Sequence, residues 1–252
     1  MQHDISIVIA TVCRNTLIRA VKSIYAQKFN GNIQILIGVD VDPFENELRL
    51  KSAIMKGKPD NFDIVWMNIG YSTSRRHGGF HSCHFGGSLR TSLSFLANSR
   101  YVMYLDDDDW LAPEHCEKIL EAVQSKAWAF SFSIYSDGNK ETPICIDRIE
   151  SVGVNKGLYA SGGGFVRPSG LILDKNQTLH LLHLWSCSIN PEGDGEDRLI
   201  FSHIKDMDHG CTDMATIYYT LDPKDIMHKI RMNYISQYGE KYIFEPKVGT
   251  IR

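Results

Sequence analysis

Residues 101–110 read Tyr-Val-Met-Tyr-Leu-Asp-Asp-Asp-Asp-Trp, so four carboxylates directly follow an apolar strand. In a parallel sheet, ligands bind beyond the carboxyl ends of the strands. Adjacent carboxylates repel one another, and Mg²⁺ or Mn²⁺, which take oxygen ligands and commonly hold substrate phosphates, relieve that repulsion. An acidic entry to the next helix would explain only one or two of the acids. We therefore predict a metal-binding carboxylate cluster at the end of a buried strand.

Two further strand ends carry charges that are expected at the same edge. The β-branched run Ile5–Thr11 leads to Arg14, and the run Ile33–Val39 leads to Asp40 and Asp42. Each charge alone is typical of a solvated surface residue. Together with the acidic run, they predict a nucleoside diphosphate held through a cation.

Strand-like and helix-like segments alternate through the first half of the chain. Strands are expected at Ile5–Thr11, Ile33–Val39, Asp63–Met67 and Arg100–Leu105. Helices are expected after a cap at Asn15, near Glu45–Met55, at Ser88–Ala97 and from Pro113, which would lie just inside the helix start. Later strands are expected at Ala127–Tyr135, Val166–Leu173 and Tyr218–Thr220, and helices at Lys175–Leu184 and Glu196–Asp208, the last stopped by Gly210. This order predicts an α/β, Rossmann-like fold with a mostly parallel central sheet and helices on both faces.

The composition indicates an ordinary folded domain. The 252 residues include 27 Lys and Arg against 30 Asp and Glu, and 43% are hydrophobic. That balance argues against nucleic-acid binding through global positive charge. Six scattered cysteines are typical of reduced thiols in a cytoplasmic protein. The run Ile5–Val12 is too short to span a membrane and is predicted to be a buried strand.

We expect one catalytic domain over residues 1–222, with a nucleotide-sugar-binding half at 1–110 and an acceptor half at 111–222. Residues 223–252 are expected to form a helical extension. Its segment Asp225–Tyr242 is compatible with a weak interfacial helix and peripheral contact at the inner face of a membrane. Packing of this segment against the domain is the favoured interpretation.

The sequence resembles a known family in five segments. Ile5–Arg14, Gly38–Asp42, Gly87–Arg90, Leu105–Trp110 and Gly193–Leu199 occur in the order seen in family 2 glycosyltransferases of the GT-A fold. The resemblance covers roughly residues 4–210, and the paired D-x-D and Glu-Asp motifs are its most specific part. It implies a nucleotide-sugar donor, most often a UDP-sugar, transfer with inversion, and Mn²⁺ or Mg²⁺ as cofactor.

The resemblance also implies roles for single positions. Asp108 would bind the metal, Arg90 would approach the base or diphosphate, and Asp106 would lie near the ribose. The family's Pro and Tyr-Asn pair near Thr11–Arg14 and its Ala-Arg-Asn around Arg90 are absent, which leaves Asp40 and Asp42 both open as the base contact. The predicted nucleotide-sugar ligands are Thr11, Arg14, Asp40, Asp42, Arg90, Asp106 and Asp107, the last in the usually variable middle position.

A second carboxylate pair, Glu196 and Asp197, follows a glycine-rich turn and opens an apolar helix. An inverting transfer needs one base for the acceptor hydroxyl. Adjacent helical residues point about 100° apart, so both acids cannot serve one hydroxyl equally, and spacing does not choose between them. Alone, the pair is typical of first-turn acids that stabilise a helix. The resemblance selects Asp197 as the base and Glu196 as an acceptor contact.

The histidines and glycine loops are less specific. His77, His81, Cys83 and His84 are zinc-capable, but the glycines around them favour a substrate-facing or surface loop. Gly162–Gly164 is expected to be a mobile acceptor-side loop, and no P-loop lysine follows it. The resemblance implies that His228 completes the metal or diphosphate site, with His209 as a weaker competitor.

These observations favour an inverting, metal-dependent transfer of one sugar to a hydroxyl of a glycan, glycolipid, other lipid-linked acceptor or small glycoside. The processive-synthase signature Gln-x-x-Arg-Trp is absent. A nucleotidyl or phosphoryl transferase would also use carboxylate-held Mg²⁺, but a glycine-rich phosphate loop is missing after the first strand. A non-catalytic nucleotide-sugar-binding module is the third hypothesis. The donor sugar, the acceptor and the oligomeric state stay open.

Overall fold

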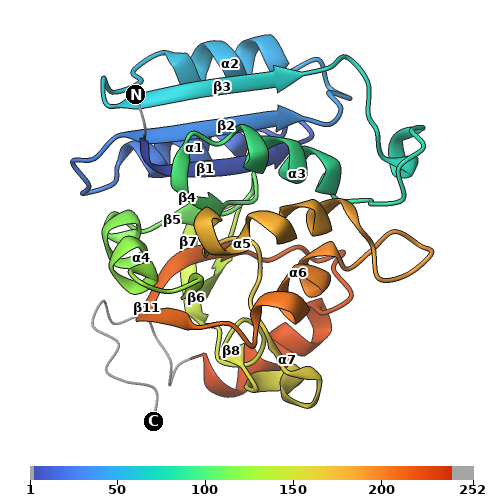
Figure 1. The fold of residues 1–252 in the computed structure, drawn as a ribbon. Helices are drawn as coiled ribbons and strands as arrows, with labels where there is room; N and C mark the ends of the chain where they lie inside the picture. Colours follow the sequence, from blue (N-terminus) through green and yellow to red (C-terminus); the bar gives the residue numbers. More distant parts are fainter. Residues whose placement is uncertain (1–2, 240–252) are drawn as a thin grey trace.

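A curled, mostly parallel sheet forms the centre of the molecule in the computed structural model, which describes residues 3–239 (Figure 1). Nine strands of the described chain belong to this sheet, eight of them in the order β3-β2-β1-β4-β10-β6-β11-β5, and β7 pairs with β6. The parallel half consists of β1 (His3–Thr11), β2 (Ile33–Val39), β3 (Phe62–Asn68) and β4 (Ser99–Tyr104). The other half consists of β5 (Trp110–Leu111), β6 (Trp128–Asp137), β7 (Thr142–Ile146), β10 (Leu171–Asp174) and β11 (His209–Thr220).

Helices cover both faces of the sheet, as the sequence predicts. One face is covered by α1 (Leu17–Tyr25), α2 (Glu47–Met55) and α4 (His115–Val123). The other face is covered by α3 (Gly87–Leu96), the 3-10 helix η3 (Leu179–Ser186) and α6 (Glu196–Ile204). Successive residues of β1 serve opposite layers, since Ile7 belongs to the first core and Val8 to the second. The predicted fold class is confirmed.

Smaller elements lie in the loops. They are the 3-10 helices η1 (Arg75–His77) and η2 (Gly157–Gly162), the two-stranded pair β8 (Gly153–Val154) and β9 (Gly164–Phe165), and the short helix α5 (Lys175–Thr178). Lys175–Leu184 was expected to be one α-helix, but it divides between α5 and η3.

Several sequence-based expectations in the second half are wrong. The expected strand Val166–Leu173 is broken, because β10 begins only at Leu171. Pro168 has no N–H for a sheet ladder, and Gly170 has a left-handed φ of +88°, so the chain turns between the two. Gly210 does not stop α6 but lies in β11, where a Cβ would meet the carbonyl oxygen of Ala122 at 1.9 Å.

The expected cap at Asn15 is also wrong. Thr16 occupies the N-cap position of α1 and makes no side-chain capping hydrogen bond. The side chain of Asn15 instead accepts a hydrogen bond from Arg49 on α2. Likewise, α4 begins at His115, two residues after the expected start at Pro113.

The C-terminal helix α7 (His228–Tyr238) packs against the domain. Arg231 and Tyr234 are buried, and the Tyr234 hydroxyl donates to the carbonyl oxygen of Ile146 at 3.0 Å. The packing interpretation is therefore confirmed for the described part of this segment. Residues 240–242 lie outside the described range, and the division of the chain at residue 222 stays a prediction.

None of the helices within residues 3–239 is long and apolar enough to cross a membrane.

His115, at the start of α4, makes stability depend on pH. It is buried, its Nδ1 lies 2.7 Å from Oγ1 of Thr216, and burial lowers the pKa of its imidazole to about 3. The unfolded chain binds a proton there below about pH 6.5, and the native protein does not until the pH is far lower. The free energy of unfolding should therefore fall as the pH drops below about 6.5, by up to about 1.4 kcal/mol per pH unit.

Urea unfolding at several pH values between neutral and mildly acidic tests this expectation. His115→Gln should lose most of this pH dependence, whereas the exposed control His203→Gln should keep it. Equal pH slopes for the wild type and His115→Gln would show that His115 is not the group responsible.

Candidate functional site

A cavity of about 560 Å³ lies beyond the carboxyl ends of β1, β2 and β4. This is where a doubly wound sheet places its ligands. Nine of the residues predicted from sequence line the cavity: Thr11, Arg14, Asp40, Arg90, Asp106, Asp107, Asp108, Glu196 and Asp197. Asp42 and His228 are not part of its lining.

Asp107 forms hydrogen bonds with the residues at the end of β1. Its carboxylate accepts hydrogen bonds from Oγ1 of Thr11 at 2.6 Å and from Nη1 of Arg14 at 3.0 Å. The same Nη1 of Arg14 donates to Oδ2 of Asp108 at 2.8 Å. Asp107 is buried, and its hydrogen bonds connect the end of the first strand to the acidic run after the fourth.

The remaining acids of the run have different surroundings. Asp109 is buried beneath the site, where Oδ1 accepts the N–H of Thr220 at 2.8 Å and Oδ2 has no hydrogen-bond partner among the described residues. Asp108 keeps about one third of its side chain exposed. Burial, together with repulsion from Asp107 and Asp106, raises the pKa of Asp108 to about 7. The charge repulsion predicted from the sequence is therefore present in the structure.

The donor set suits a hard divalent cation shared with a ligand. Within residues 3–239, no three His, Cys, Asp or Glu side chains form a preformed metal site. Mg²⁺ and Mn²⁺ sites at phosphate-transfer centres commonly use one or two carboxylates and complete their shell with phosphate and water oxygens. Asp108, with its raised pKa and its place in the cavity wall, fits that pattern.

Arg90 joins the two acidic motifs. From α3, Nη2 donates to Oδ1 of Asp106 at 2.6 Å, and Nη1 lies 3.5 Å from Oε1 of Glu196. Nη1 also donates to the carbonyl oxygen of Phe85 at 2.5 Å. The guanidinium is buried, so these contacts hold the carboxylates in place with little screening by water.

The Glu-Asp pair begins α6 after Gly195, whose left-handed φ of +84° turns the chain into the helix. Burial raises the pKa of Glu196 to about 7. Burial also raises the pKa of Asp197, whose Oδ1 accepts the N–H of Arg198 at 2.7 Å. Both carboxyls are therefore better bases than an exposed carboxylate, and the structure by itself does not choose between them.

The structure separates Asp40 from Asp42. Asp40 is buried in the cavity wall, where it accepts a hydrogen bond from Oγ of Ser72 at 2.6 Å. Asp42 accepts the backbone N–H groups of Asn46 and Glu47 at 2.9 and 2.8 Å and so holds the start of α2. Of the two candidates for the base contact, only Asp40 lines the cavity.

The other predicted positions are dispersed. His77 and His84 line the cavity, whereas Nδ1 of His81 accepts the N–H of Cys83 at 3.2 Å. His228 begins α7 just beyond the lining residues Ile226 and Met227, and its Nδ1 is buried with no hydrogen-bond partner among the described residues. His209 stacks on Trp128, with ring centroids 4.7 Å apart, and the cavity lining does not include it. The Gly162–Gly164 segment joins η2 to β9.

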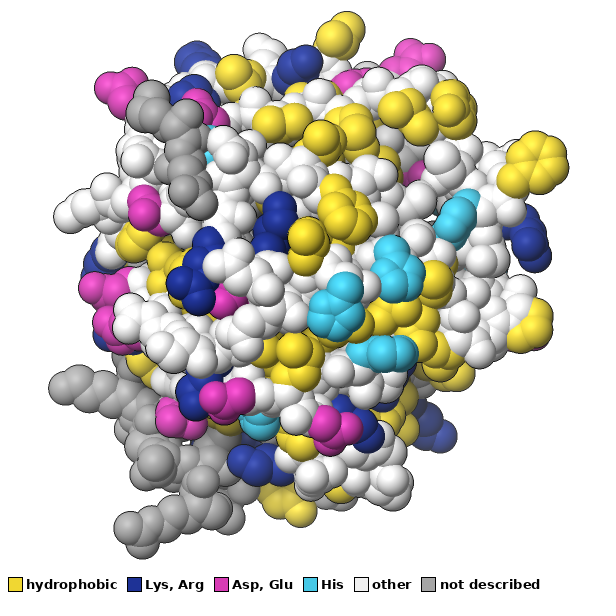
Figure 2. Space-filling model, in the orientation of Figure 1, with side chains coloured by type: hydrophobic (Ala, Val, Ile, Leu, Met, Phe, Trp, Pro, Cys, Tyr) yellow, Lys and Arg dark blue, Asp and Glu magenta, His cyan; other side chains and the backbone are white. Residues whose placement is uncertain are grey.

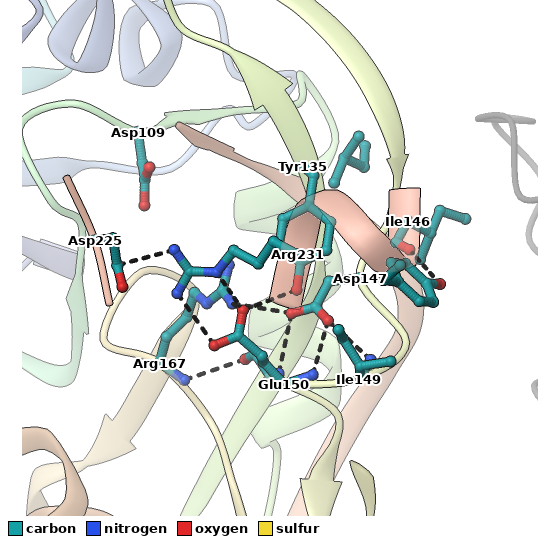
Figure 3. Close-up of polar contacts among 12 residues, drawn as sticks. Asp109, Tyr135, Ile146, Asp147, Ile149, Glu150, Arg167, Asp225 and Arg231 are labelled. Carbon is teal, nitrogen blue, oxygen red and sulfur yellow. Dashed lines mark hydrogen bonds and ion pairs between the residues drawn. The ribbon is translucent and has the colours of Figure 1, made fainter. Parts of the chain in front are cut away.

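A buried ionic cluster that sequence reasoning missed borders the cavity (Figure 3). Arg231 donates to Glu150 at 2.5 and 3.1 Å and to Asp225 at 2.8 Å, and Arg167 donates to Asp147 at 2.9 Å. Glu150, Arg167, Asp225 and Arg231 all line the cavity. The cluster attaches α7 to the cavity wall. Its sequence signal is weak, because its members are single charges on distant segments.

Arg198 is a second cavity residue that the sequence did not predict. Its guanidinium carbon lies 3.7 Å from the ring centroid of Tyr159 and 4.0 Å from that of Phe165. All three residues line the cavity beside Asp197. This pairing adds an aromatic wall on the Asp197 side of the cavity.

Comparison with known proteins shows the fold. No protein-family model matches the sequence, and no curated protein matches it. Among solved structures, S. aureus TarS 1–349 in complex with UDP-GlcNAc matches with a TM-score of 0.62 and 12% identity, covering 96% of this chain and 68% of that one. A second S. aureus TarS structure matches with a TM-score of 0.55 and 13% identity, covering 96% of this chain and 41% of that one.

The mannosyltransferase PcManGT from Pyrobaculum calidifontis, in complex with GDP-Man and Mn²⁺, matches with a TM-score of 0.58 and 10% identity. The match covers 99% of this chain and 66% of that one. At these identities the likeness concerns architecture. The chain has the fold of the GT-A glycosyltransferases.

Proposed function

We propose that the protein is a metal-dependent glycosyltransferase that moves one sugar from a nucleotide-sugar donor, a UDP-sugar in the first instance, to an acceptor hydroxyl with inversion. One observation carries the proposal. A single cavity at the carboxyl ends of the strands is lined by the acidic run after β4, by Arg14 and by the Glu-Asp pair of α6, and Arg90 bridges the two acidic groups. The fold shared with structures that hold UDP-GlcNAc, or GDP-Man with Mn²⁺, supports it.

The residues divide into a donor side and an acceptor side. In the proposal, Asp40 and Thr11 face the nucleoside, Arg14 and Arg90 face the diphosphate, and Asp106 faces the ribose. Asp108 holds the Mn²⁺ or Mg²⁺ ion, which stabilises the charge of the departing diphosphate. His228 is the proposed second ligand of the ion, and Asp42, which holds the start of α2, is assigned no contact with the donor.

On the acceptor side, Asp197 takes the proton of the attacking hydroxyl, and Glu196 contacts the acceptor. Burial raises the pKa of both carboxyls, which makes each a stronger base than an exposed carboxylate. Tyr159, which is half-buried and lines the cavity, provides an aromatic ring on the acceptor side. The acceptor itself is a glycan, a glycolipid or a small glycoside.

A panel of nucleotide sugars incubated with and without Mn²⁺ tests the proposal, with nucleoside diphosphate release as the readout. We expect release that requires the metal and is fastest with one UDP-sugar. Release of pyrophosphate would instead support a nucleotidyl transferase. Thermal stabilisation by UDP and Mn²⁺ without turnover on any acceptor would support a binding module.

A further inference from the structure

Two long segments of the chain contain no acidic residue. From Ile64 to Leu105 there is no Asp or Glu, although the whole chain contains 30. A second acid-free segment extends from Lys175 to Pro191. The first segment includes the loop after β3, η1 and α3, and the second includes η3 and the loop that follows it.

These segments form one continuous surface. The hydroxyl of Thr73 in the first loop hydrogen-bonds to that of Ser88 on α3. On the other side of α3, Thr91 donates to the carbonyl oxygen of Leu182 on η3 at 3.2 Å. Gly87 lies so close to η3 that a Cβ would meet a carbonyl oxygen at 2.0 Å. The acid-free segments are therefore neighbours in space.

Large apolar side chains project from this surface. The ring of Phe80 is fully exposed, at 100%, and the exposed fractions of five more side chains lie between 48% and 57%. Ile69 and Tyr71, just after β3, are exposed by 42% and 67%. We call the group the aromatic face; its members are Phe80, Phe85, Phe95, Leu96, Leu179 and Ile189. Figure 2 shows this side of the molecule, where hydrophobic and histidine side chains gather at the centre and right while acidic side chains lie mainly at the left, top and bottom.

Two exposed cations lie among these side chains. Arg75 and Arg76 belong to η1, a few residues before Phe80, and the guanidinium carbon of Arg76 is 5.2 Å from the ring centroid of Phe85. Two acids of other segments lie at the border: the carboxylate of Asp194 is 3.7 Å from the ring of His84, and that of Asp40 is 3.7 Å from the ring of His77. The surface therefore combines apolar side chains with positive charge, and the two segments that form it contribute no carboxylate.

We propose that the aromatic face docks on an anionic lipid surface. Exposed apolar rings gain free energy by entering the boundary between headgroups and acyl chains, and arginines near the surface are attracted by anionic headgroups. A protein partner would favour a broad apolar core in which charge is depleted. Here the most exposed ring lies on a loop next to two cations, an arrangement that suits a headgroup layer.

This docking surface is continuous with the mouth of the cavity. Phe85, a member of the aromatic face, and Arg76, whose guanidinium lies over the Phe85 ring, both line the cavity. Docking would turn the mouth towards the membrane plane. If the proposed function holds, the acceptor that reaches Asp197 is carried by a lipid, and its sugar or hydroxyl stands at the level of the headgroups.

The test is co-sedimentation of the full chain with vesicles, without nucleotide or metal. Equimolar phosphatidylglycerol and phosphatidylcholine vesicles should bind the wild type, and phosphatidylcholine vesicles should bind it much more weakly. The variant Phe80→Ser/Arg75→Glu should lose about tenfold or more in affinity for the anionic vesicles, because it removes the exposed ring and reverses one charge. Neither residue lines the cavity.

The matched control is Met55→Ser/Lys56→Glu. Both residues are exposed at the end of α2. This helix runs from the carboxyl end of β2 to the amino end of β3, so its last residues lie away from the strand ends that border the cavity. The control should bind anionic vesicles like the wild type. No binding of the wild type, an equal loss in both variants, or a wild-type dimer that Phe80→Ser/Arg75→Glu dissociates would overturn the proposal. Because no nucleotide is present, the result does not depend on whether the chain transfers a sugar.

Discussion

Asp108→Asn is expected to reduce metal-dependent UDP release by at least about 100-fold, because a metal supplies several kcal/mol of stabilisation to a leaving diphosphate. Asparagine keeps the size of the side chain but loses the charge that holds the ion. In the wild type, burial and the neighbouring acids raise the pKa of Asp108 to about 7. A cation that binds there must displace the proton, so Mn²⁺ affinity should increase with pH around neutrality.

The measurements are UDP release and calorimetric titration with Mn²⁺ in the presence of UDP. Asp208→Asn is the matched control, since this exposed carboxylate pairs with Lys126 and does not line the cavity. It should behave like the wild type. Full activity of Asp108→Asn, or wild-type turnover in the presence of a strong chelator, would rule out the proposed metal role.

Asp197→Asn is expected to lower kcat by about 10²–10⁴-fold, the range that a general base contributes. The affinity for UDP with Mn²⁺ should stay within about twofold of the wild type, because the nucleotide ligands in the proposal lie on other elements. The substitution is nearly isosteric and keeps an oxygen that can accept the N–H of Arg198, as Oδ1 does in the wild type. Single-turnover kinetics and thermal shift with UDP separate the two effects.

Glu196→Gln is the informative comparison. If Glu196 contacts the acceptor, this variant should mainly raise the acceptor KM. Its carboxyl also has a raised pKa, about 7, and its Oε1 lies 3.5 Å from Nη1 of Arg90. A large loss of kcat in Glu196→Gln combined with near-normal kcat in Asp197→Asn would assign the base to Glu196 instead.

The first half of the fold was predictable because its elements are local. β1 and β2 are β-branched runs with charges close after them, and the helix between them, α1, shows helical spacing. The alternation of strands with helices then implies a parallel sheet, and this inference needs no knowledge of contacts between distant residues. The strand ends consequently meet, and nine of the predicted residues line one cavity.

The strands of the second half depend on contacts between distant residues, which the hydrophobic periodicity of the sequence does not reveal. Leu171–Asp174 forms β10 only by inserting between β4 and β6, antiparallel to both. β11 extends from His209, well before the expected Tyr218, because β6 offers a partner along most of its length. Pairing partners far apart in sequence decide such strands, and propensity alone does not reveal them.

The sequence by itself determined the acidic run, the second carboxylate pair and the order of the strands that bring them to one edge. Only the tertiary structure decided where each carboxylate lies and what it contacts. Asp40 lies in the cavity wall, whereas Asp42 accepts N–H groups at the start of α2. Asp107 pairs with Arg14, and Asp109 is buried and accepts the N–H of Thr220. The physical reason is that the role of a carboxylate depends on its burial and its partners. Those partners, from Thr11 to Thr220, come together only when the chain folds.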